Sequence, residues 1–188
     1  MPVSHQKNIY SVLALVDDMQ KKSGVESILD IGTGFGKYGL LLRERMDVRF
    51  LRYHKEDWVT RIDGIEPFKE YITPVHKHIY DTLYLSQIEY IINQLTNYDI
   101  IIMIDVLEHL DKELGTEVLK KLDSLTNKLL ILSFPIHPGS YKPRGGTPWD
   151  NKLEIHKCLW SEADISDIIG PVKHFKSTVW AKNKIILM

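Results

Sequence analysis

Three glycines at alternate positions follow a short apolar run near the start of the chain. Residues 27–31 read Ser-Ile-Leu-Asp-Ile, and Gly32, Gly34 and Gly36 come directly before a helix-forming stretch that begins at Lys37. Glycine permits backbone conformations and close approaches that a Cβ would block, and a helix N-terminus offers unpaired N–H groups. A strand, a glycine turn and a helix in this order predict a nucleotide-binding site in an α/β fold.

The spacing of the glycines separates two classes of nucleotide-binding turn. A dinucleotide fingerprint reads G-x-G-x-x-G, and its third glycine would fall at position 37, where this chain has a lysine. From Asp30 to Gly36 the chain reads D-x-G-x-G-x-G instead. This pattern resembles the first motif of the class I S-adenosylmethionine-dependent methyltransferases.

A second motif occurs after the most apolar segment of the chain. Residues 98–105 form a nearly unbroken apolar run that ends at Asp105, which is typical of a parallel strand buried on both faces. The run continues into Asp105-Val-Leu-Glu-His-Leu110. This sequence is similar to the segment after the fourth strand in small-molecule methyltransferases of the same class, so the resemblance spans roughly residues 25–135.

The length of the chain favours a single domain over residues 1–188, and the resemblance implies a Rossmann-like α/β fold. Its sheet would have seven mostly parallel strands, helices on both faces and an antiparallel last strand, and the alternating strand and helix patterns agree with this. Helices are expected over residues 4–22 (within an N-terminal segment 1–24), 37–46, 68–76, 82–95, 111–125 and 161–169. Strands are expected over residues 25–30, 61–65, 78–80, 98–105, 128–134, 172–180 and 184–188.

Acidic residues at strand ends are the main candidates for contacts with the cofactor. Glu66 follows a short strand, and a carboxylate there can accept hydrogen bonds from two vicinal ribose hydroxyls. The resemblance implies that Asp81 accepts from the adenine amino group, although Asp81 is equally well explained as a helix cap. The full set of expected S-adenosylmethionine contacts is Asp30, Gly32, Thr33, Gly34, Gly36, Glu66, Pro67, Phe68, Asp81, Asp105 and Val106.

His109 is the candidate catalytic residue, because a histidine pKa suits proton transfer near neutral pH. A role in capping a helix or in packing is the alternative for this side chain. His137, His156 and Glu154 match no metal-ligand spacing, so no metal is predicted. The Pro- and Gly-rich residues 135–151 leave the carboxyl end of a strand and are expected to form a substrate lid.

The composition gives no strong signal for binding to nucleic acid or to a membrane. The formal net charge is −1, which implies no overall attraction to nucleic acid. Residues 47–60 mix basic, acidic and aromatic side chains, and this favours a surface extension over a nucleic-acid-binding site. The single Cys158 excludes an intrachain disulfide, and no apolar run is long enough to span a membrane. We therefore expect a cytoplasmic protein without a strong nucleic-acid or membrane signal, and nothing in the sequence specifies its oligomeric state.

The resemblance implies a methyltransferase, and the acceptor is expected to be a small molecule. The chain has neither the Asn-Pro-Pro-aromatic motif of nucleic-acid amino-group methyltransferases nor the Pro-Cys pair of cytosine C5 methyltransferases. Two other functions are compatible with the sequence. One is a non-catalytic cofactor-binding or scaffold module of the same fold. The other is a nicotinamide-dependent oxidoreductase, but Lys37 in place of the third glycine and the second motif argue against it.

Overall fold

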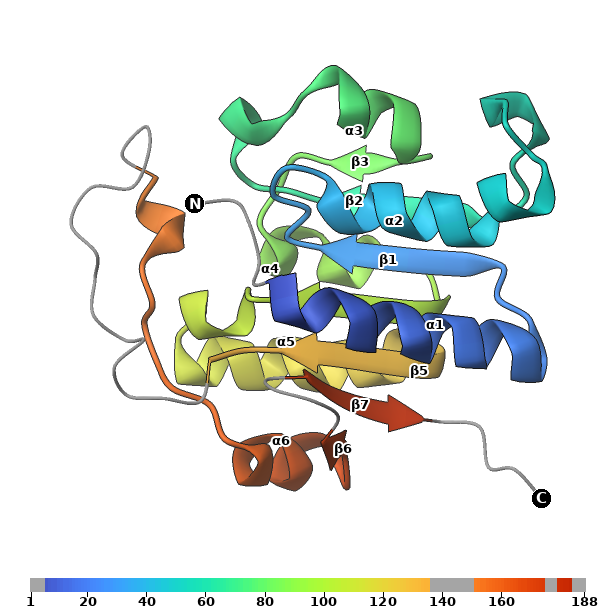
Figure 1. Ribbon diagram of the computed structural model, residues 1–188. Coiled ribbons are helices and arrows are strands. Elements are labelled where there is room, and N and C mark those ends of the chain that lie inside the picture. Colours follow the sequence, from blue (N-terminus) through green and yellow to red (C-terminus); the bar gives the residue numbers. More distant parts are fainter. Residues whose placement is uncertain (1–5, 136–150, 175–178, 184–188) are drawn as a thin grey trace.

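A seven-stranded sheet forms the centre of the molecule (Figure 1). The computed structural model describes residues 6–135, 151–174 and 179–183. Five neighbouring strands run parallel, and β7 pairs antiparallel with both β5 and β6. In spatial order the strands are β3 (Leu83–Tyr84), β2 (Arg61–Ile65), β1 (Ser27–Ile31), β4 (Tyr98–Ile104), β5 (Thr126–Ser133), β7 (Val179–Asn183) and β6 (Lys173–His174). The predicted α/β architecture is confirmed.

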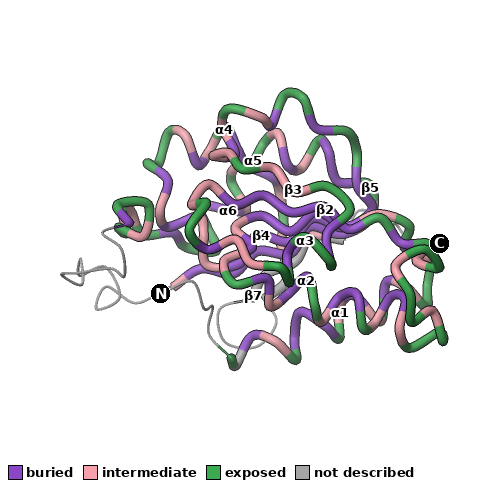
Figure 2. Tube along the Cα trace, turned by 90° about the horizontal axis from the view of Figure 1, so that it is seen from above, coloured by how far each residue is buried: buried purple, intermediate pink, exposed green. Residues whose placement is uncertain are grey.

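Helices cover both faces of the sheet, and the buried strands lie between them (Figure 2). One face carries α1 (Ile9–Ser23), α2 (Lys37–Met46) and α3 (Pro74–Ile79), and the other carries α4 (Ile88–Ile91), α5 (Lys112–Leu125) and α6 (Glu162–Ile169). Short 3-10 helices are η1 (Gln6–Asn8), η2 (Val48–Phe50), η3 (Lys55–Asp57), η4 (Lys69–Tyr71), η5 (Ile92–Gln94), η6 (Leu107–His109) and η9 (Lys152–Glu154). No helix in the described ranges is long and apolar enough to cross a membrane.

Strand β4 is the centre of both cores. All seven of its residues are buried, and its side chains alternate between the two faces. Ile100 and Ile102 pack with α1 and α2, whereas Ile101 and Met103 pack with α5. Each such side chain contributes about 1.5–3 kcal/mol through burial, so the apolar run fixes β4 between the two helical layers.

The segment between β2 and β4 differs from the prediction. The expected helix 68–76, strand 78–80 and helix 82–95 are wrong, because α3 begins at Pro74 and β3 contains only residues 83–84. Proline is favourable in the first turn of a helix, where its missing N–H has no partner to lose. Pro74 therefore begins a helix instead of ending one, and residues 78–79 lie in its last turn.

The two ends of the chain match the prediction in part. Helix α1 stops at Gly24, whose φ is +66°, as predicted, but it begins at Ile9 and follows a 3-10 turn. The C-terminal hairpin is built from β6 and β7, so the expected single strand over 172–180 is wrong. The expected strand 184–188 and residues 136–150 of the expected lid lie outside the described part of the chain.

The extension between α2 and β2 folds around a buried ion pair. Nη1 of Arg43 lies 2.6 Å from Oδ2 of Asp47, and both side chains are almost fully buried. Arg52 also pairs with Asp47 at 2.9 Å, and the Trp58 ring centroid lies 4.1 Å from the Arg43 guanidinium carbon. These arginines neutralise charge within the protein, which agrees with the interpretation of residues 47–60 as a surface extension.

Candidate active site

The glycine turn lies at the carboxyl edge of the sheet, on the left in Figure 1. The φ angles of Gly32, Gly34 and Gly36 are +76°, +55° and +85°, a region that side chains with a Cβ rarely adopt. The amides of Gly32 and Thr33 donate to the carbonyl of Ile65 at 2.9 and 3.1 Å, which ties the turn to the end of β2. The alternating glycines are thus required by the backbone path of the turn.

The two sequence motifs are in direct contact. A Cβ added to Gly32 would lie 2.2 Å from Cγ2 of Val106, so the residue after Asp105 packs against the glycine turn. Asp105 itself has a φ of +54° and accepts a hydrogen bond from Oγ of Ser133 at 3.1 Å. Ser133 in turn accepts from Nδ2 of Asn8 at 2.8 Å, which brings the start of α1 to the same edge.

Glu66 lies next to the glycine turn. Its Oε2 accepts from the backbone N–H of Gly34 at 2.8 Å, and its Oε1 accepts from that of Phe68 at 2.9 Å. Burial raises the pKa of Glu66 to about 7 despite these two hydrogen bonds, and the nearby carboxylates of Glu154 and Asp30 raise it further. A buried carboxylate is therefore held in one orientation at the point where the first two strands end.

His76 stabilises the glycine turn through a hydrogen bond to the carbonyl of Gly34. The backbone N–H of Thr73 donates to Nδ1 of His76 at 3.2 Å, so Nε2 carries the proton and donates to the carbonyl of Gly34 at 2.9 Å. Burial lowers the pKa of His76, which favours this neutral form. His76 was not predicted to support the glycine turn. The only local signal is the helix start at Thr73-Pro74, which comes just before it.

Asp30 is buried behind the turn. Its Oδ2 accepts a hydrogen bond of 2.6 Å from the hydroxyl of Tyr80, a residue that the sequence analysis placed in a strand. Burial raises the pKa of Asp30 to about 6, against the effect of the Tyr80 and Gly39 hydrogen bonds. Asp30 lies beside the site with its carboxylate already engaged by the protein.

Pro67 and Phe68 follow Glu66 directly, and Thr33 lies within the glycine turn. Phe68 forms an edge-to-face contact with Tyr71, with the ring centroids 4.8 Å apart. Thr33 is buried, and its Oγ1 has no hydrogen-bond partner within the described residues. A free buried hydroxyl next to a glycine turn is consistent with a site that receives a polar ligand.

Asp81 is not part of this group. Its Oδ2 accepts from the backbone N–H of Ile62 at 2.7 Å and from Nη2 of Arg43 at 3.0 Å. Ile62 lies near the amino end of β2 and Glu66 follows its carboxyl end, about 13 Å further along the strand. The placement of Asp81 at the cofactor site is therefore wrong, because residues 78–80 do not form the third strand.

His109 lies at the same edge of the sheet, in the 3-10 helix η6 after β4. Its Nδ1 is 3.2 Å from the carbonyl oxygen of Ile155, which can only accept, so Nδ1 carries the proton and Nε2 has a free lone pair. Burial lowers the pKa of His109 below its usual value. The imidazole is therefore neutral near pH 7, as a proton acceptor must be.

Residues 151–157 pass over this edge and add polar groups that the sequence analysis did not assign. The hydroxyl of Tyr71 donates to Oε1 of Glu154 at 3.0 Å, and Nδ2 of Asn151 lies 3.3 Å from the same hydroxyl. Burial is the main cause of the raised pKa of both Glu66 and Glu108, and the charge of Glu154 adds to it in each case. Glu154 is thus close enough to both carboxylates to affect their charge.

Comparison with known proteins identifies the fold. No protein-family model and no curated protein matches the sequence. Among solved structures, magnesium protoporphyrin IX methyltransferase from Synechocystis PCC 6803 with bound S-adenosylhomocysteine has a TM-score of 0.63 and 21% identity, with 94% of this chain and 82% of that chain covered.

Two further solved structures have a similar fold. The plantazolicin methyltransferase BpumL in complex with S-adenosylhomocysteine has a TM-score of 0.59 and 16% identity, over 86% of this chain and 62% of that chain. WbdD, co-crystallised with a kinase inhibitor, has a TM-score of 0.64 and 15% identity, over 97% of this chain and 41% of that chain. The chain therefore has the methyltransferase fold that its two motifs predict.

Proposed function

We propose that the chain is an S-adenosylmethionine-dependent methyltransferase that acts on a small-molecule acceptor. The observation that carries this proposal is the contact between Gly34 and Glu66, which sets a buried carboxylate against the glycine turn at the ends of β1 and β2. Ligands of open parallel sheets bind at this edge, outside the carboxyl ends of the strands. The two methyltransferases of similar fold and the motif after β4 support the same conclusion.

The residues around the turn have distinct proposed roles. Glu66 accepts from the ribose hydroxyls, since each carboxylate oxygen keeps a lone pair beyond its backbone hydrogen bond. The backbone of Gly32, Thr33 and Gly34 lines the amino-acid and ribose portions, and Phe68 packs against the adenine. Asp105 is proposed to organise the ammonium group.

When bound, S-adenosylmethionine supplies an already activated methyl group on a sulfonium centre, so the protein contributes orientation and proton transfer. His109 has its Nε2 lone pair free and lies beside residues 151–157, which support an acceptor site at this edge. We assign it the contact with the acceptor. The near-neutral net charge favours a small molecule over a nucleic acid.

A turnover assay tests the proposal. The protein is incubated with S-adenosylmethionine and a panel of phenols, catechols, amines and carboxylic acids, and S-adenosylhomocysteine is quantified by mass spectrometry. We expect acceptor-dependent product with at least one class and its loss in Glu66→Ala. Binding of S-adenosylmethionine without turnover on any acceptor would favour the non-catalytic cofactor-binding module instead.

A further inference from the structure

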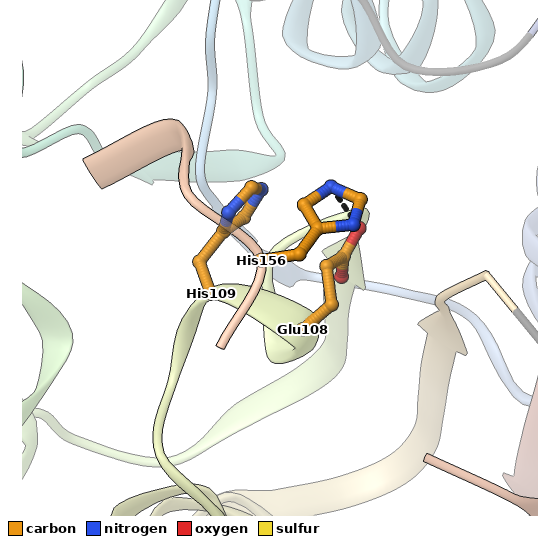
Figure 3. A group of neighbouring side chains, drawn as sticks. All are labelled: Glu108, His109 and His156. Atoms are coloured by element: carbon orange, nitrogen blue, oxygen red, sulfur yellow. Dashed lines mark ion pairs between the residues drawn. The ribbon is translucent and has the colours of Figure 1, made fainter. Parts of the chain in front are cut away.

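Three side chains with metal-binding atoms meet at the end of β4. One ligand atom from each of Glu108, His109 and His156 lies within 4.8 Å of the others. Figure 3 shows the two imidazole rings and the carboxylate gathered from two segments, η6 and the chain after η9. His156 is 47 positions from His109, so no sequence spacing indicated this group.

The group is not satisfied by its own contacts. Glu108 is only 3% exposed, and its Oε2 has no hydrogen-bond partner among the described residues. Nδ1 of His156 is also buried without a partner in the same part of the chain. The nearest approach of the two side chains, Nε2 to Oε1, is 4.0 Å, which is too long for a hydrogen bond. Leaving such groups unpaired is costly, so a cation between them would stabilise the site.

The hydrogen bonding of His109 is that of a metal ligand. Its Nδ1–H donates to the carbonyl of Ile155, and this fixes the ring orientation and leaves Nε2 free. Histidines that bind metals usually donate their other N–H to a carboxylate or a backbone carbonyl in this way. The edge-to-face packing of His109 and His156, with ring centroids 4.9 Å apart, sets the second imidazole beside the first.

The backbone holds the two segments together. The N–H of Lys157 donates to the carbonyl of Glu108 at 2.8 Å, and that of Cys158 approaches the same oxygen at 3.4 Å. Nζ of Lys157 also pairs with Asp111 at 3.2 Å. These contacts follow His156 directly, and the hydrogen bond between His109 and the carbonyl of Ile155 precedes it, so the ligand positions exist before any ion binds.

We propose that Glu108, His109 and His156 bind one divalent transition-metal ion, with Zn²⁺ as the reference ion. Two imidazoles and one carboxylate suit zinc and its neighbours, whereas Mg²⁺ prefers an all-oxygen shell. Three protein ligands leave a coordination position for an oxygen atom. No metal was predicted from the sequence, because the spacing of His156 relative to Glu108 and His109 matches no ligand signature.

The site also narrows the acceptor, and this step rests on the proposed function. A divalent ion lowers the pKa of a bound hydroxyl, so the acceptor class is an alcohol or a phenol. Its O–H proton leaves to solvent, the oxygen forms a bond to the methyl carbon, and the carbon–sulfur bond breaks with its electron pair on sulfur. With the ion bound, the Nε2 lone pair of His109 is used by the metal, so His109 acts on the acceptor through the ion, and this replaces the direct contact and proton transfer assigned to it in the metal-free protein.

Metal titration of the chelator-treated full chain, without S-adenosylmethionine, tests the site. Zn²⁺ is titrated by calorimetry, and Co²⁺ is followed by its visible absorption. We expect one ion per chain and affinity at least about tenfold weaker in Glu108→Gln and in His156→Gln. His54→Gln, which removes an exposed histidine from the extension, is the matched control and should bind as the parent does.

Each outcome decides the proposal. Absence of zinc binding in the parent, or equal affinity in Glu108→Gln, would overturn it. If both variants fail to fold, the visible spectrum of Co²⁺ bound to the parent protein tests the proposal. Ligation by histidine nitrogens and a carboxylate should change this spectrum from that of the hydrated ion, and an unchanged spectrum would overturn the proposal. Titration of S-adenosylmethionine into the metal-free protein tests the cofactor site separately, so failure of one site is distinguished from failure of the other.

Discussion

The backbone N–H of Gly34 donates a hydrogen bond to Oε2 of Glu66 across 2.8 Å, and this contact joins the ends of two neighbouring parallel strands. His76 holds the same residue from the other side through the Gly34 carbonyl. The glycine turn is thus fixed between a carboxylate and an imidazole that come from elements 32 and 42 positions further along the chain. This arrangement gives Glu66 one defined orientation toward the proposed ribose site.

Replacement of Glu66 tests that orientation. Glu66→Ala removes a charged acceptor worth about 1.5–3 kcal/mol, so affinity for S-adenosylmethionine should fall about 10- to 150-fold. Isothermal titration calorimetry measures the change, and Glu70→Ala, an exposed acid in η4, serves as the control. Equal affinities in the parent and in Glu66→Ala would remove Glu66 from the site.

The raised pKa of Glu66 predicts a pH dependence of cofactor binding. Only the ionised carboxylate accepts from both ribose hydroxyls, and burial raises its pKa to about 7 with help from Glu154 and Asp30. Affinity should therefore be about tenfold weaker at pH 6 than its plateau above pH 7. Glu66→Gln, which cannot ionise, should bind with little change between these pH values; a slope as steep as that of the parent would contradict the assignment.

Gly32 and Gly24 both have a positive φ, +76° and +66°, but only Gly32 lies against another side chain, so the pair distinguishes backbone strain from steric overlap. Gly32→Ala incurs the cost of a left-handed conformation, about 1–2 kcal/mol, and also an overlap with Val106 that adds about 1–3 kcal/mol. Gly24→Ala incurs backbone strain alone, about 1–3 kcal/mol at its φ of +66° and ψ of 161°, because nothing lies within 4 Å of its added Cβ. Urea unfolding should show the larger loss for Gly32→Ala and partial recovery in Gly32→Ala/Val106→Ala. Equal losses for the two single variants would show that Val106 moves without cost.

The Tyr80–Asp30 hydrogen bond predicts a pH-dependent loss of stability. Tyr80→Phe leaves a buried carboxylate without this donor, which costs about 1–3 kcal/mol when Asp30 is ionised. Because the folded pKa of Asp30 is about 6, above its usual 3.8, the native state holds a proton that the unfolded state releases between these values. The free energy of unfolding contributed by Asp30 therefore falls as pH rises through this window.

The difference between parent and Tyr80→Phe should accordingly be small near pH 4 and larger at pH 7. Chemical unfolding at both pH values measures it, with Tyr10→Phe, an exposed tyrosine, as the control. A difference that does not change with pH would mean that the hydroxyl stabilises Asp30 equally in both protonation states.

Local sequence patterns were sufficient to predict several of the helices and strands. The bounds 37–46 of α2 follow from the glycine turn before it, and β4 follows from an apolar run that only a strand covered on both faces can bury. The region around α3 was not predictable in the same way. Pro74 is compatible with the end or the start of a helix, and the contacts of His76 with Thr73 and Gly34 that favour the start involve a residue 42 positions away.

The site was predictable only where its residues follow a strand directly. Glu66 and Asp105 lie at strand ends, where the sequence predicts them, whereas Glu154 and His156 reach the same edge through residues 151–157. Asp81 was predicted at the cofactor site because the third strand was expected over residues 78–80, whereas β3 spans residues 83–84 and Asp81 precedes it. Non-local backbone contacts, such as that between Lys157 and Glu108, decide which of these side chains meet.

Calorimetric titration of the purified chain with S-adenosylmethionine, with NAD titrated in parallel, tests the central claim most directly. The account predicts binding of S-adenosylmethionine at one site per chain, weakened in Glu66→Ala, and no binding of NAD. Binding of NAD alone would contradict it and would favour the oxidoreductase interpretation of the glycine turn.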